Sequence, residues 1–194
     1  MDEKLSVNDA INKLNDEDPK IRTFAVNSLK GIKDEKIIQP LIEALKDEDI
    51  LIKYDIAKIL GGMGELAAEH LIAKIEKEED DFKKFALLAL KETKSNKTID
   101  YFVDYLNNEN WSLRKIAIRS LGELKAIDYI DLISNATNDE DWGVRLAAIR
   151  SLGDLEVEEA IAPIKKARRK NKDKDFKKAA NKAIKQIEKA VNKK

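Results

Sequence analysis

The chain has 194 residues, of which 37 are Lys or Arg and 37 are Asp or Glu, so its formal net charge at pH 7 is zero. With no cysteine and one histidine, His70, it has almost none of the residues that most catalytic and metal sites use. No apolar run approaches the roughly 20 residues of a membrane-spanning helix. We therefore expect a protein without enzymatic activity, cofactor, metal or membrane span.

The two ends of the chain differ in charge. Residues 1–6 have neither the basic nor the apolar region of a secretory signal, so we expect a cytoplasmic protein. Residues 165–194 hold 14 Lys or Arg against three acids, a net charge of +11, which leaves −11 for residues 1–164. Such a basic segment is either an arm for an acidic partner or a solvated cap at the end of the fold, and we expect a cap.

A unit of about 31 residues recurs six times along the chain. The segments that begin at Asp16, Asp47 and Asp139 align without gaps, and each ends on an apolar residue. Each unit has the pattern of two short helices, and no segment alternates like a strand. The six units cover approximately residues 5–36, 37–66, 67–97, 98–125, 126–157 and 158–194, with the basic segment as C-terminal cap.

The second helix of each unit carries an apolar stripe with a spacing of four residues. One helix pair cannot bury such a stripe alone, so the units must pack in a row, as in an α-solenoid. We therefore predict an all-α fold, an α-α superhelix in which residues 1–194 form one domain. The stripe residues are Ile21, Ala25, Leu29, Ile52, Ile56, Leu60, Phe82, Ala86, Leu90, Leu113, Ala117, Leu121, Val144, Ala148, Leu152, Phe176, Ala180 and Ile184.

Acids mark where the second helices begin, and glycines mark where they end. The acidic triplets 47–49 and 139–141 are suited to cap the helix N-termini, because a carboxylate accepts a backbone N–H there and favours the positive end of the helix dipole. Near the C-termini stand Gly31, Gly61, Gly122 and Gly153. We expect each of these glycines to close its helix in the left-handed conformation.

Two segments, 114–122 and 145–153, share the pattern Arg-x-x-Ala-x-x-x-Leu-Gly. This pattern, at a period of about 31 residues, resembles the HEAT-like repeats of the phycobilisome lyase type over nearly the whole chain. The resemblance implies that the second helices line the concave side of the superhelix. It also implies a structural ladder that pairs an acid with a basic residue six positions on. The pairs that fit are Asp16 with Arg22, Asp47 with Lys53 and Asp139 with Arg145, and the ladder is interrupted at Lys77, Asn108 and Asn171.

Residues two positions off the apolar stripe form a ridge that faces away from the core, because two residues turn a helix by about 200°. The two tryptophans of the chain occupy the same ridge position in adjacent units. Since Trp, Tyr and Arg dominate binding hot spots, we expect a non-catalytic scaffold for a protein partner with an acidic segment and apolar anchors. The alternative is that each indole packs over its own helix. The candidate partner-binding residues are Tyr54, Lys58, Trp111, Lys115, Arg119, Trp142, Leu146 and Arg150.

Two other functions stay open from the sequence. The ridge is basic from Lys84 onward, which would suit nucleic acid, and the repeats also resemble HEAT-like DNA-alkylation repair proteins. Against this, the 34 acids of residues 1–164 would repel phosphate unless they lie on another face. The resemblance also allows a bilin-lyase-like subunit, although no residue of this chain addresses a tetrapyrrole. Protein binding is the function we expect.

Overall fold

The computed structural model describes residues 4–193. The chain forms two compact units, Met1–Thr98 and Ile99–Lys194, each built from helix pairs. No residue in the described range lies in a strand, so the predicted all-α fold class is confirmed. Nor does any helix of that range combine the length and the apolar character needed to cross a membrane. That residues 1–194 form a single domain stays a prediction.

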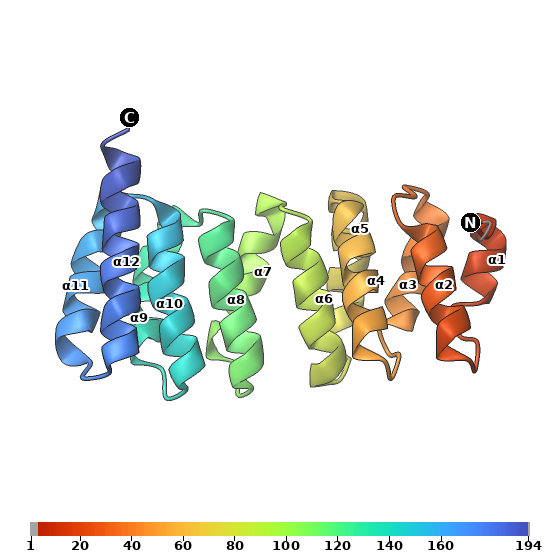
Figure 1. Cartoon of the computed structure of the whole chain (residues 1–194), viewed down its shortest axis with the longest axis horizontal. Coiled ribbons are helices and arrows are strands. Elements are labelled where there is room, and N and C mark those ends of the chain that lie inside the picture. The colour runs from red at the N-terminus through yellow and green to blue at the C-terminus, as the bar shows by residue number, and fades with distance from the viewer. Residues whose placement is uncertain (1–3, 194) are drawn as a thin grey trace. The chain divides into compact units, whose positions relative to one another are not determined.

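In the first unit, the second helices of three repeats form a row. Helices α2, α4 and α6 lie side by side, nearer the viewer than α3 and α5 (Figure 1). Asp18 and Asp49 cap α2 and α4 by accepting hydrogen bonds from the backbone N–H groups of Lys20 and Leu51, both at 2.8 Å, as the acidic clusters predict. The helices of this unit are α1 (Val7–Asn12), α2 (Pro19–Leu29), α3 (Ile38–Ala44), α4 (Ile50–Gly62), α5 (Glu65–Ile75) and α6 (Asp80–Glu92).

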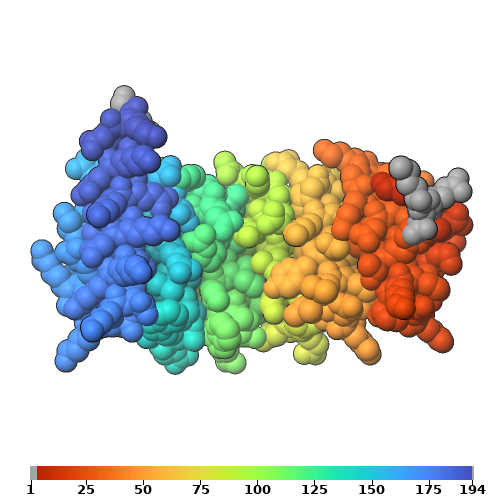
Figure 2. Space-filling model, viewed as in Figure 1, coloured from red at the N-terminus to blue at the C-terminus, as the bar shows by residue number. Residues whose placement is uncertain are grey.

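The second unit repeats this arrangement. Helices α8, α10 and α12 lie side by side, and Figure 2 turns the face that they form toward the viewer. Asn110 and Asp141 cap α8 and α10 by accepting the backbone N–H groups of Ser112 and Val144. The helices of this unit are α7 (Ile99–Asp104), α8 (Trp111–Glu123), α9 (Ile130–Asn135), α10 (Trp142–Leu155), α11 (Ile161–Lys170) and α12 (Lys174–Val191).

The predicted apolar stripes form the core of both units. Of their 18 residues, only Ile21 is not buried. Ile21 is half-buried on α2, which is flanked on one side by α1, a helix of 6 residues. The small middle residues are fully buried, as at Ala117 and Ala148, where α8 and α10 pack together. The periodicity of the sequence therefore identifies the packing face of each second helix.

The predicted role of the glycines is wrong at three of four positions. Gly31 has the expected left-handed conformation, with φ of 82°. Gly61, Gly122 and Gly153 lie inside α4, α8 and α10 instead, where the neighbouring helix comes very close. A Cβ atom on Gly122 would lie 2.6 Å from Cα of Ser151, so only glycine fits. These glycines serve helix packing, and the residues with positive φ that follow α6, α8 and α10 are Lys94, Lys125 and Glu156.

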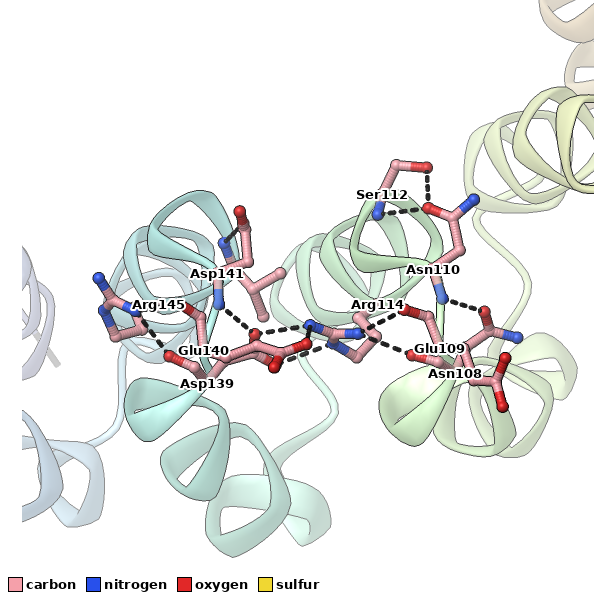
Figure 3. A network of polar contacts seen from close by, with 10 residues as sticks. Asn108, Glu109, Asn110, Ser112, Arg114, Asp139, Glu140, Asp141 and Arg145 are labelled. Carbon is pink, nitrogen blue, oxygen red and sulfur yellow. Dashed lines mark hydrogen bonds and ion pairs between the residues drawn. The ribbon is translucent and has the colours of Figure 1, made fainter.

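A ladder of polar contacts joins successive repeats within each unit, and Figure 3 shows part of it in the second unit. In the second unit, Arg114 donates from Nε and Nη2 to the carboxylate of Asp139, at 2.9 and 2.8 Å. Its Nη1 donates to the backbone carbonyls of Asn108 and Glu109. The Asp139 carboxylate also accepts a hydrogen bond from the backbone N–H of Asp141, at 2.8 Å. The arginine thus ties the loop of its own repeat to the acid of the following repeat.

The ladder predicted from the resemblance therefore has the wrong partner. Arg22 does not pair with the carboxylate of Asp16: it donates to the backbone carbonyls of Asp16 and Glu17 and pairs with the carboxylate of Asp47, at 2.7 Å, in the next repeat. The reason is that the side chain of Asp47 accepts the N–H of Asp49 in its own loop, which turns the carboxylate toward the preceding repeat. The predicted interruption at Lys77 is also bypassed, because Lys53 pairs with Asp81.

The ion pair between Arg114 and Asp139 shifts the pKa of both groups. Burial raises the pKa of the Asp139 carboxyl, but the hydrogen bonds from Arg114 and from the N–H of Asp141 outweigh it, so the pKa lies below its ordinary value. The hydrogen bond to Asp139 raises the pKa of Arg114, against the opposing effect of burial. Both side chains are largely covered, with exposed fractions of 8% and 12%. Both groups therefore stay charged in the folded protein at neutral pH.

Candidate partner-binding surface

The two tryptophans are exposed at equivalent positions of neighbouring helices. Trp111 is the first residue of α8 and Trp142 the first residue of α10. Their exposed fractions are 50% and 43%. Because α8 and α10 lie side by side in the second unit, both indoles belong to one face. At these exposed fractions, neither indole is sealed in the interior.

Lys115 reaches from one tryptophan toward the other. Its Nζ atom lies 5.6 Å from the ring centroid of Trp111, within the range of a cation–π interaction. Its side chain also extends to the first turn of α10, where a Cβ atom on Gly143 would lie 3.8 Å from its Cδ. Gly143 directly follows Trp142. A positive charge therefore stands on the face that carries both indoles.

A groove continues this face between α10 and α12. It has a volume of about 530 Å³ and is partly open to solvent. Leu146 differs from the prediction of an exposed ridge residue: only 8% of it is exposed, and it is part of the apolar lining of the groove because α12 packs beside α10. The groove is lined by Arg119, Trp142, Leu146, Arg150, Asp154, Asp175, Lys178, Ala179, Lys182, Ala183 and Gln186.

The charges of the groove are satisfied at one end only. Arg119 donates to Asp154 at 2.8 Å and to Glu123 at 3.1 Å, and Gln186 donates to the other carboxylate oxygen of Asp154 at 3.3 Å. Three further cations line the groove: Arg150, Lys178 and Lys182. Their side chains form no hydrogen bond or ion pair with any residue in the described range. The middle of the groove therefore carries uncompensated positive charge.

The structure brings six of the eight predicted binding residues into the second unit. Tyr54 and Lys58 belong to the first unit, where both lie on α4. The ring of Tyr54 is 40% exposed and packs edge to face on Phe85, with ring centroids 5.1 Å apart. Lys58 lines a smaller hollow beside the ion pair of Lys30 and Asp55. The binding role of Tyr54 and Lys58 stays a prediction.

Sequence reasoning missed the contribution of α12 to the site. Lys178 and Lys182 occupy the same repeat positions as Leu146 and Arg150, and this correspondence was the signal that could have found them. The sequence predicts both lysines on the basic part of the ridge and in the C-terminal cap, but not among the candidate partner-binding residues. No cluster of three or more His, Asp or Glu side chains within residues 4–193 is arranged to hold a metal ion. The candidate site consists of aromatic, aliphatic and cationic side chains.

Comparison with known proteins defines this chain as a helical repeat protein and also identifies its family. The chain matches the family model of HEAT repeats over residues 7–91, 68–132 and 99–185, and it belongs to this family. No curated protein matches it.

Several solved structures are similar in fold. The complex of CpcE and CpcF of phycocyanin lyase from Nostoc sp. PCC7120 is similar with a TM-score of 0.72 and 18% identity, covering 77% of this chain and 99% of that chain. An engineered protein is similar with a TM-score of 0.59 and 17% identity, covering 95% and 97%. A designed armadillo repeat protein in complex with the peptide (KR)4 has a TM-score of 0.57 and 15% identity, covering 94% and 100%. These likenesses show the fold alone.

Proposed function

We propose that this protein is a non-catalytic interaction module of the cytoplasm that binds a protein partner through the second helices of its second unit. We call the contact area the tryptophan surface. The observation that carries the proposal is the pair of half-exposed indoles at equivalent positions of α8 and α10. The tryptophan surface consists of Trp111, Lys115, Arg119, Trp142, Leu146 and Arg150.

Physical chemistry favours binding at such a surface. An aromatic side chain buries about 150–250 Å² in a contact, and Trp and Arg are enriched among the residues that dominate binding energies. Two neighbouring indoles therefore offer a partner a large apolar contact whose geometry the helices fix in advance. Binding of this kind requires only contact with the two indoles, so the proposed function needs no catalytic residue.

The charge of the second unit favours an acidic partner. Residues 99–194 hold 20 Lys or Arg and 16 Asp or Glu, a net charge of +4, whereas residues 1–98 hold 17 and 21, a net charge of −4. Opposite charge steers a partner toward the matching surface and disfavours partners of like charge. A protein segment that carries both carboxylates and apolar side chains fits the tryptophan surface, because the indoles offer an apolar contact and the cations can pair with carboxylates.

Site-directed photo-crosslinking in an extract of the source cells tests the proposal. A photoreactive amino acid replaces Lys115, between the indoles, and in a matched control it replaces Leu132, which is exposed on α9. We expect a protein adduct from position 115 that is absent from position 132. The adduct is lost when Trp111 and Trp142 are both changed to Ala with unchanged helix content.

Three outcomes contradict the proposal. These are equal adducts from both positions, an adduct that survives loss of both tryptophans, and an adduct that nuclease treatment removes. The last outcome would assign the surface to nucleic acid. Tyr54 and Lys58 are proposed as further contacts, and changing either to Ala should weaken capture by a smaller factor, because the Tyr54 ring is already partly covered by Phe85.

A further inference from the structure

We infer that the groove between α10 and α12 selects a partner segment with an apolar side chain at one end and a carboxylate at the other. This inference rests on the proposed function and specifies the partner's chemistry. The apolar side chain lies on Trp142 and Leu146. The carboxylate lies among Arg150, Lys178 and Lys182.

The register of the two helices places these groups in a definite order. The hydrogen bond from Gln186 to Asp154 sets α12 against α10 at one end of the groove. Side chains four residues apart lie on one face of a helix, about 6 Å apart along its axis. One turn toward the helix N-termini therefore places Lys182 beside Arg150.

The same register continues to the other end of the groove. Two turns from Asp154, Lys178 stands beside Leu146, and three turns away Asp175 lies near Trp142. The α10 side of the groove thus changes from aromatic to aliphatic to cationic within three turns. This gradient is a directional pattern that a partner must match.

A carboxylate is the group that the cationic part of the groove lacks. Arg150 and Lys182 are like charges on facing helices, so each raises the electrostatic energy of the other. Asp154 is not their partner, because its two oxygens accept hydrogen bonds from Arg119 and Gln186 and form none with Arg150 or Lys182. A carboxylate from a partner could pair with the guanidinium in the bidentate geometry that arginine favours.

Asp175 sets the direction of binding. It lines the groove near the tryptophan end and has no ion-pair partner in the described part of the chain. A second carboxylate at that end would meet this negative charge, whereas an apolar side chain would not. The distance from Trp142 to Arg150, two turns or about 12 Å, is spanned by about four residues of an extended segment.

Fluorescence anisotropy with synthetic peptides tests this inference. The probe has two leucines separated by two serines from two glutamates and carries a neutral fluorophore. Two matched peptides replace the glutamates by glutamine or the leucines by serine. We expect the first peptide to bind at least tenfold more tightly than either matched peptide, with an affinity that falls as salt is added. Equal affinity of the glutamate and glutamine peptides would overturn the inference, as would failure of all three to bind.

Charge reversal in the protein provides the second arm. Arg150→Glu combined with Lys182→Glu should weaken the glutamate peptide at least tenfold. A control with the same change in net charge is Lys185→Glu combined with Lys189→Glu, since both lysines are exposed on α12 and line no part of the groove. This control should bind as the native protein does, and equal effects of the two double variants would contradict a specific carboxylate site. Circular dichroism checks that both fold.

The two proposals fail in distinguishable ways. A tryptophan-dependent adduct at position 115 that persists in the Arg150→Glu, Lys182→Glu protein would leave the proposed function in place and overturn the carboxylate site. Loss of the adduct in that protein, but not in the Lys185→Glu, Lys189→Glu control, supports both. Absence of any tryptophan-dependent adduct rejects the proposed function itself.

Discussion

The two units of the molecule share a frame and differ in their ridges. In both, a buried leucine or isoleucine closes each stripe, as at Leu90 and Leu121, and an arginine joins consecutive repeats, as at Arg22 and Arg114. The ridges at the same repeat positions are unlike. In the first unit, α4 presents Ile50, Tyr54 and Lys58, and the ring of Tyr54 packs on Phe85. In the second unit, the equivalent positions of α8 and α10 hold two indoles beside cations.

The shared core and the unlike ridges indicate that different sequence positions determine folding and function. Positions that face the next repeat are constrained by packing, so they vary little between units. Positions two residues away contact solvent, so they are free to differ, and a binding role can be placed there without loss of stability. Exchanges at core and ladder positions should therefore act alike in both units, whereas exchanges of the half-exposed Trp111 and Trp142 should act mainly on binding.

The largest expected effect is at the core, where the units should behave alike. Leu90→Ala and Leu121→Ala each remove a fully buried side chain, so each should lower the free energy of unfolding by about 2–5 kcal/mol. Leu51→Ala, at a side chain that is 71% exposed, is the matched control and should change stability by less than about 0.5 kcal/mol. Urea unfolding measures all three. A stability within error of the native protein for either core variant would refute the repeat register.

The ladder gives the next largest effect. Arg114→Ala leaves the covered carboxylate of Asp139 without its cationic partner and removes the arginine donor from two backbone carbonyls, so we expect a loss of about 3 kcal/mol. Arg22→Ala should act in the same direction in the first unit. Lys97→Ala breaks an ion pair to Glu65 whose partners are 69% and 55% exposed, so it should lower stability far less than Arg114→Ala does. If Lys97→Ala were as harmful as Arg114→Ala, burial of the ladder would not be the cause of its strength.

Two neighbouring glycines of α4 should respond to alanine in opposite ways: one substitution should lower stability and the other should raise it. A Cβ atom on Gly61 would lie 2.3 Å from Cβ of Glu92, so Gly61→Ala should lower stability by about 1–3 kcal/mol. Gly122→Ala should do the same in the second unit. Gly62 has no atom within 4 Å of its Cβ position, so Gly62→Ala should raise stability by up to about 1 kcal/mol through helix propensity. Thermal unfolding distinguishes the signs, and stabilisation by Gly61→Ala would contradict the close helix approach.

The smallest expected effect is a dependence on pH. Because the pKa of Asp139 is lower in the folded protein than in the unfolded chain, its contribution to stability is full above about pH 4 and is lost as the pH falls through the folded pKa. The stability difference between the native protein and Asp139→Asn should therefore shrink below about pH 4. Urea unfolding from pH 7 to pH 3 measures it. If this stability difference stays constant over the range, the charge of Asp139 does not contribute to stability.

The sequence predicts the packing face within one repeat better than it predicts the contacts between two repeats. The stripes at Leu121 and Leu152 follow from periodicity, because a buried face must recur with the helix turn. The function of Gly122 and the true partner of Arg22 could not be predicted, because both depend on how closely and in which direction the next repeat packs. Leu146 was expected on the exposed ridge for the same reason, since its burial is due to α12.

The most direct test of the tryptophan surface is ¹⁹F NMR of protein labelled with 5-fluorotryptophan. The chain has two tryptophans, so the spectrum has two resonances, one from α8 and one from α10, while an unlabelled partner contributes none. Addition of the crosslinked partner in purified form should shift or broaden both resonances. If the partner binds and neither resonance changes, Trp111 and Trp142 are not the contact, and the account is wrong.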